Sequence, residues 1–167
     1  IKVSPDGSTW ADALAIDAAT ANASFAGSVR PAADNAKTLG ASGARWSAVW
    51  SATGTIQTSD IRLKTDIAPT DLGLDFILGL NPVRYRWRDG GMENGTPRPG
   101  KRMHYGLIAQ EVAEQARACG ADDVAFHVLA HPADPESQQA LRYDQLIAPL
   151  IAAIQTLSAR LDRLESR

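Results

Sequence analysis

The chain has 167 residues, enough for one modest domain with an appendage. Its 17 Lys and Arg nearly balance its 19 Asp and Glu, and a net charge of −2 argues against a general nucleic-acid or membrane-surface binder. A lone cysteine, Cys119, excludes an internal disulfide, and no apolar run approaches the roughly 20 residues that span a bilayer.

The first region, residues 1–58, is rich in alanine, serine, threonine and glycine. It starts at Ile1 without a signal-peptide pattern, so we expect that it was cut from a longer protein. Pairs such as Asp6-Gly7 and Asp34-Asn35 predict short strands and turns. So few large apolar residues cannot offset the entropy of ordering the segment. We expect either a β-rich segment that intertwines with other copies, which its tryptophans favour, or a flexible linker.

The middle region, about residues 59–141, has the pattern of a compact α+β domain. Thr70 or Asp71 is predicted to cap a short helix over 72–80, which Pro82 ends. Alternating large apolar and arginine side chains over 83–88 predict a half-buried strand with a basic outer face. That face could touch nucleic acid, but a solvated sheet surface is the better interpretation. The glycines and prolines of 88–101 predict a loop.

A second helix is predicted over 108–116, with Ile108, Val112 and Ala116 on one face and Gly120 near its C-terminal end. A further strand is predicted through Val124, Phe126 and Val128, followed by a loop over 131–136. His104, His127 and His131 lack metal-ligand spacing with Cys119, so we expect no metal site and no cofactor.

The last region predicts a long helix, about 143–166, with a coiled-coil seam. Apolar residues recur at alternating spacings of three and four: Ile147, Leu150, Ile154, Leu157, Leu161 and Leu164. Because so short a seam is marginal alone in water, it needs partner chains or its own domain. We favour oligomerisation over a helix folded back on the domain, because the charged residues lie off the seam.

Several motifs together resemble one family, the endosialidase-type C-terminal intramolecular chaperone of phage tailspikes and tail fibres. They occur in family order as TSDIRLK (58–64), GLDFI (73–77), LNPVRYRW (80–87), GLIAQEV (106–112) and YDQLIAPL (143–150). Residues 34–56 also resemble the fibre end that usually precedes this domain. The resemblance implies that 1–58 is the end of a fibre shaft and 59–167 an auto-processing chaperone.

The resemblance implies a homotrimer in which the chaperone registers three fibre chains and then cuts itself off. The scissile bond maps to Thr58–Ser59, with Ser59 as nucleophile and Lys64 as general base. Assembly would occur in the host cytoplasm, and the mature fibre would join the virion tail without the released chaperone. Alternatives are a trimerisation cap that never cuts and, less favoured, a nucleic-acid-binding transcription factor, since membrane-bound factors borrow this domain.

Four further residues are candidates for supporting roles. Asp60 and Arg62 are expected to pair with each other or to cap a bend, with a catalytic role less favoured. Gln110 and Glu111 begin a helix, where the dipole favours a carboxylate, and the family implies packing against a neighbouring chain. No nucleophile-elbow sequence surrounds Ser59, which argues against a conventional triad.

The proposed chemistry sets a geometric condition. A serine hydroxyl needs a base, and a lysine can serve where burial favours its neutral form. Ser59 Oγ can attack the adjacent carbonyl of Thr58 intramolecularly, with an effective molarity on the order of 10⁵ M or more. Residues at this separation lie on opposite faces of a strand, so Ser59 and Lys64 can meet only across a bend or between chains. We expect trimer formation to desolvate and align them.

Overall fold

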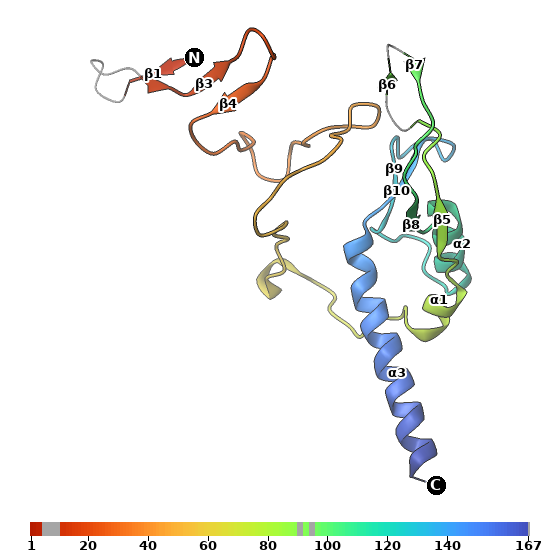
Figure 1. Ribbon diagram of the computed structural model, residues 1–167. Helices are drawn as coiled ribbons and strands as arrows, with labels where there is room; N and C mark the ends of the chain where they lie inside the picture. The colour runs from red at the N-terminus through yellow and green to blue at the C-terminus, as the bar shows by residue number, and fades with distance from the viewer. Residues whose placement is uncertain (5–10, 90–91, 94–95, 167) are drawn as a thin grey trace. The chain divides into compact units, whose positions relative to one another are not determined.

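The computed structural model describes residues 1–4, 11–89, 92–93 and 96–166, and it contains two compact units, 1–49 and 50–167 (Figure 1). We describe each unit by itself. The predicted turn at Asp6-Gly7 lies outside the described residues.

Unit 1 consists of short strands and turns, as its composition predicts. Strand β1 (Lys2–Val3) pairs antiparallel with β2 (Ala11–Asp12), and β3 (Leu14–Ile16) pairs with β4 (Ala23–Phe25). None of its described residues is buried, and Trp46 is 63% exposed. The described part of this unit therefore has no core of its own, which agrees with its shortage of large apolar residues.

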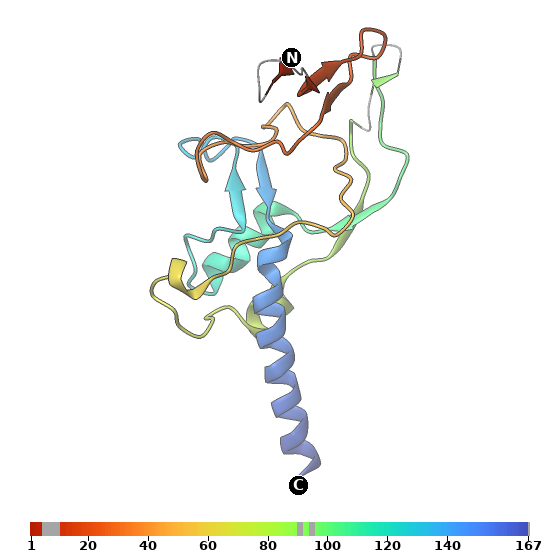
Figure 2. The same cartoon turned by 90° about the vertical axis from the view of Figure 1, so that its left-hand side faces the viewer.

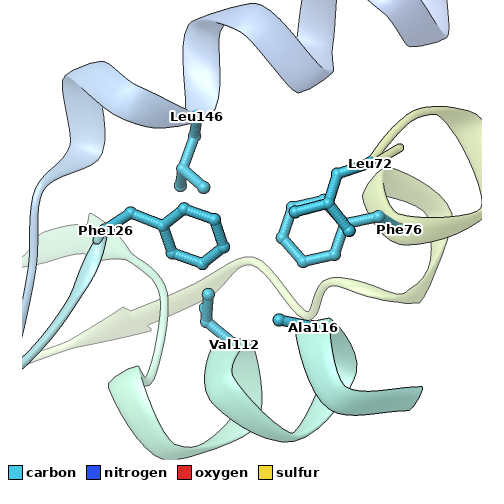
Figure 3. Close-up of a cluster of buried hydrophobic side chains, with 6 residues drawn as sticks. All are labelled: Leu72, Phe76, Val112, Ala116, Phe126 and Leu146. Carbon is cyan, nitrogen blue, oxygen red and sulfur yellow. The ribbon is translucent and has the colours of Figure 1, made fainter. Parts of the chain in front are cut away.

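Unit 2 is built around a small apolar core contributed by separate segments. Helix α1 (Leu74–Gly79), helix α2 (Ala109–Ala118) and the start of helix α3 (Ile147–Glu165) surround it. Figure 3 shows the rings of Phe76 and Phe126 facing each other across the core. The centroids of these two rings are 5.8 Å apart. The cluster consists of Leu72, Phe76, Val112, Ala116, Phe126 and Leu146.

Helix α1 starts later than predicted. The Thr70 hydroxyl bonds the backbone N–H and carbonyl of Leu72 instead of capping a helix, and Gly73 occupies the cap position without a side-chain bond. This local bond holds Leu72 outside the helix, with its side chain in the core. The helix ends at Gly79, and Leu80 is extended, which places it before Asn81-Pro82 as predicted.

The basic strand is shorter than its alternation predicts. Strand β5 (Val83–Tyr85) pairs antiparallel with β8 (His104–Gly106). Trp87 lies beyond β5, where its carbonyl accepts from Gly100 N at 2.8 Å and its ring packs edge-on against Tyr85. The paired ladder ends at Tyr85, so the prediction that the strand extends through 88 was wrong.

The predicted loop 88–101 contains two short strands, β6 (Met92–Glu93) and β7 (Thr96–Pro97), which pair antiparallel. A loop alone was therefore an incomplete prediction, because two-residue strands leave no detectable alternation. Residues 90–91 and 94–95, which include three glycines of that predicted loop, lie outside the described part of the chain.

Helix α2 agrees well with its prediction. Ile108 is the N-terminal cap, and Val112, Ala113 and Ala116 are buried. Gly120 has a φ of 84° and donates to the carbonyl of Arg117 at 2.9 Å. This left-handed conformation after the last turn is one that glycine adopts without a Cβ penalty, which confirms that Gly120 ends the helix.

A hairpin follows α2, formed by β9 (His127–Leu129) and β10 (Gln139–Leu141). The strand was predicted through Val124, but Val124 and Phe126 precede it, and Phe126 enters the core. Burial of Phe126, rather than period-two pairing, explains the apolar spacing there. Strand β10 was not predicted.

Helix α3 follows the 3-10 turn η2 (Tyr143–Leu146), so the predicted helical span about 143–166 is matched closely. Pro149 lies in the first turn, where a missing N–H is tolerated. Figures 1 and 2 both show α3 beside α1 over its first half, while its C-terminal half extends beyond the other elements of unit 2.

Candidate functional site

The segment 59–64 forms a tight bend rather than a strand or a helix. Asp60 is extended, with φ −70° and ψ 130°, and the 3-10 turn η1 (Ile61–Leu63) follows it. Leu63 N donates to the Asp60 carbonyl and Lys64 N donates to the Ile61 carbonyl, each at 3.1 Å. Lys64 then returns to an extended conformation.

This bend brings the two predicted catalytic side chains together within one chain. Lys64 Nζ donates to Ser59 Oγ at 2.7 Å. Of the two routes that the sequence left open, a bend and a contact between chains, the structure contains the bend. Both residues are exposed to solvent in the described chain.

The observed contact shows the pair as an amine donor and a hydroxyl acceptor. For catalysis the direction must reverse, because a general base has to be a neutral amine that takes the hydroxyl proton. The distance between Lys64 Nζ and Ser59 Oγ allows a proton to pass either way, because proton transfer needs a separation of roughly 2.6–3.2 Å between the two heavy atoms. The pair thus has the distance that serine activation requires.

Asp60 and Arg62 both pair with each other and cap the bend. The carboxylate of Asp60 accepts from the Arg62 backbone N–H at 2.9 Å and from its guanidinium Nη2 at 2.5 Å. The guanidinium hydrogen bonds and then the backbone bond hold the pKa of the Asp60 carboxyl below its ordinary value. The same side-chain contact raises the pKa of Arg62. Both candidates therefore act on the local geometry of the bend.

Gln110 and Glu111 lie in the first turn of α2, away from these contacts. Glu111 Oε2 accepts from Asn81 Nδ2 at 3.1 Å, and Gln110 is exposed at a groove beside the β9–β10 hairpin. Within the described part of the chain, every hydrogen bond of residues 59–64 stays inside that segment. The structure thus does not bring Gln110 or Glu111 to Ser59.

The predicted seam is an exposed apolar face of α3. Its six residues are between 44% and 67% exposed, and the face that packs on the domain is a different one, with Pro149 and Ala153 buried. The sequence pattern correctly identified an apolar stripe on α3, and whether other copies of the chain cover that stripe stays a prediction.

One positioning residue was missed by the sequence reasoning. The Tyr143 hydroxyl accepts from Leu107 N at 2.9 Å and thereby joins the start of α3 to the start of α2. A Cβ on Gly106 would lie 2.6 Å from that hydroxyl oxygen, so only glycine leaves room for it. Neither Tyr143 nor Gly106 lies in a periodic pattern of the sequence. The hydrogen bond between Tyr143 and Leu107 spans 36 positions, so no local signal predicts it.

The described residues also bear on two other kinds of site. No group of three or more His, Cys, Asp or Glu side chains is arranged to hold a metal ion among them. Of the three histidines, His127 has its ring nitrogen Nε2 hydrogen-bonded to Gln139 Oε1, at 2.7 Å. Among the helices of the described chain, none combines the length and apolar character needed to cross a membrane.

Comparisons with known proteins bear on residues 59–120 and on the fold. The chain resembles, with a TM-score of 0.55, the structure of the carboxy-terminal domain of the bacteriophage T5 L-shaped tail fibre with its intramolecular chaperone domain. The two share 19% identity over 92% of this chain, which spans 43% of the T5 chain. No curated protein matches. Residues 59–120, from the candidate nucleophile to the end of α2, match a peptidase family described as the chaperone of endosialidase, the family that the motifs resemble.

Proposed function

We propose that residues 59–167 are an intramolecular chaperone that trimerises and folds the fibre segment preceding it, and that then releases itself by cutting the Thr58–Ser59 bond. The single observation that carries the proposal is the 2.7 Å contact of Lys64 with Ser59, which is the first residue of the family match. The T5 structure, which contains a tail fibre with an intramolecular chaperone domain, supports the fibre context.

The reaction follows from the two side chains. Neutral Lys64 takes the hydroxyl proton of Ser59 as Oγ attacks the Thr58 carbonyl carbon. The bond from that carbon to the Ser59 nitrogen breaks, and Lys64 returns the proton to the departing nitrogen. The result is an ester between the Thr58 acyl group and Ser59 Oγ, which water hydrolyses to a free carboxylate and the original hydroxyl.

Trimerisation would use the exposed seam of α3. An apolar stripe at the spacing of Leu157, Leu161 and Leu164, on a helix that extends past its own domain, leaves large side chains in water. Burying one such side chain fully contributes about 1.5–3 kcal/mol, which favours association of several copies along this face. The partner is therefore a second and third copy of this chain, and the proposed site of action is the assembling phage tail fibre in the host cytoplasm.

Assembly would control cleavage mainly by removing water. Ser59 and Lys64 already touch in the single chain, so alignment need not wait for other copies. The exposed amine, however, is stabilised in its charged form by water. Covering the bend in the trimer would favour the neutral amine, so that cutting reports correct assembly.

The decisive experiment compares the full chain with Ser59→Ala and Lys64→Ala on denaturing gels. We expect two fragments, divided ahead of Ser59, from the parent chain alone. Lys101→Ala, which removes another exposed lysine of unit 2, is the matched control and should cleave normally. Cleavage in either dyad variant would refute the proposed chemistry. An uncut but trimeric parent chain would instead favour the structural cap.

The control by assembly needs a separate test. Freshly synthesised chain is diluted in steps, and the cleavage rate is compared with the fraction of trimer in size-exclusion chromatography. We expect both to fall together. Cleavage at full rate in the monomer would remove the link between assembly and processing.

A further inference from the structure

The bend between Ser59 and Lys64 is held by one carboxylate with two sets of partners. Asp60 Oδ1 accepts from the backbone N–H of Arg62, which caps η1. The guanidinium Nε of Arg62 lies 3.0 Å from each carboxylate oxygen, and its Nη2 reaches Oδ2. The side chain of Asp60 is therefore fastened to both the backbone and the side chain of Arg62.

The turn has little else to support it. A single 3-10 turn has poor hydrogen-bond geometry and a costly nucleus, so it is marginal in water. η1 contains no buried residue, and the side chains of Ile61 and Leu63 are exposed. Within the described chain the bend receives no hydrogen bond from any other element. The contacts of Asp60 with Arg62 are thus its main side-chain restraint.

Loss of the turn would separate the catalytic pair. If residues 59–64 extended, the Cα atoms of Ser59 and Lys64 would lie about 16 Å apart, at roughly 3.3 Å per residue. Their side chains would also point to opposite faces of the chain. The population of the turn therefore sets the fraction of chains in which the amine reaches the hydroxyl.

We propose that Asp60 and Arg62 form a positioning clamp that holds Lys64 against Ser59 before other copies of the chain assemble. This inference rests on the proposed self-cleavage. Neither residue is a catalytic residue, since neither touches the scissile bond. Both carboxylate oxygens of Asp60 are occupied by Arg62, which keeps the group ionised and makes it a poor proton acceptor. Lys64 remains the base.

The test follows the cleavage rate of newly synthesised full-length chain as a function of pH. Asp60→Ala removes the cap and the ion pair together, and we expect cleavage to slow by about tenfold, the effect of losing a strong N-cap. Asp60→Asn keeps a cap acceptor and Arg62→Lys keeps the charge, so each should slow cleavage by less. Arg62→Lys keeps every charge of the segment, so the rate of this variant should have the same pH midpoint as that of the parent chain.

Controls separate this inference from the proposed function. Asp71→Ala, which removes another exposed carboxylate of unit 2, should cleave at the parent rate, and every clamp variant should still trimerise. If Lys64→Ala cleaves, the proposed function itself is wrong. If Lys64→Ala is inactive while Asp60→Ala and Arg62→Lys both cleave at the parent rate, only the clamp is overturned. A pH midpoint shifted in Arg62→Lys, or loss of the trimer in all clamp variants, would also overturn it, in favour of an electrostatic or a general structural role.

Discussion

Phe76 offers the sharpest test of how the core of unit 2 is held. The side chain is 1% exposed and faces Phe126 in Figure 3, with Val112 and Ala116 from α2 beside it. Phe76→Ala would remove nearly all of this contact. Because the neighbouring side chains come from separate, already packed segments, we expect only partial collapse of the cavity.

We expect Phe76→Ala to lower the free energy of unfolding by about 3–5 kcal/mol, which is the range for replacing a buried phenylalanine with alanine. Small domains have only about 5–15 kcal/mol in total. For a domain of this size, a loss of about 3 kcal/mol lowers the melting temperature by roughly 12 °C or more. We therefore expect unit 2 to fold poorly at physiological temperature and the proposed cut at Thr58–Ser59 not to occur.

The assay is urea unfolding followed by far-ultraviolet circular dichroism, which reports on the α-helices, all of them in unit 2 among the described residues. All variants also carry Ser59→Ala, so that the proposed self-cleavage cannot divide the chain during the measurement. One protein concentration is used throughout, because association of copies shifts the apparent stability. Leu78→Ala in the same helix is the matched control, since Leu78 is 71% exposed and should cost less than about 0.5 kcal/mol. Equal losses for both variants, or a loss below about 1 kcal/mol for Phe76→Ala, would refute this account of the core.

Three further outcomes are expected. Tyr143→Phe loses the hydrogen bond to Leu107 N and should lower the unfolding free energy by about 1 kcal/mol in the same assay. Leu161→Asp places a charge on the exposed seam and should abolish the proposed trimer in light scattering while leaving the helical content of the domain unchanged. A carboxyl titration by NMR should find the pKa of Asp60 below its ordinary value, and Arg62→Gln should raise it. Because the folded-state pKa is the lowered one, the stabilisation of the bend by this carboxylate is present above the ordinary value and is lost as the pH falls through the folded-state value.

Each of these has its own control and contrary result. Tyr105→Phe, on an exposed ring, should be neutral, and an equal loss would show that the hydroxyl bond to Leu107 contributes nothing. Ala159→Asp lies on the opposite side of α3 from the seam, and it should leave the proposed trimer intact. An ordinary pKa for Asp60 would show that the clamp with Arg62 does not persist in solution.

Local patterns in the sequence determined the elements whose signals are repeated or chemically specific. The spacing of three and four identified α3 and its apolar stripe, and Gly120 marked the end of α2 because only a residue without Cβ adopts its φ of 84° readily. The TSDIRLK motif identified Ser59 and Lys64 by resemblance alone. Spacing without the motif would have predicted an ordinary exposed lysine.

Tertiary structure decided everything that depends on contacts between distant residues. Phe126 leaves the predicted strand because its ring is buried against Phe76, and the Tyr143–Leu107 bond joins two elements that share no local pattern. The bend at η1 lies between these cases: the sequence named Asp60 and Arg62, but only three-dimensional structure could show that their contacts fold the segment so that Lys64 reaches Ser59. A backbone turn of three residues has too little periodicity to be predicted, because its conformation depends on which side-chain hydrogen bonds form.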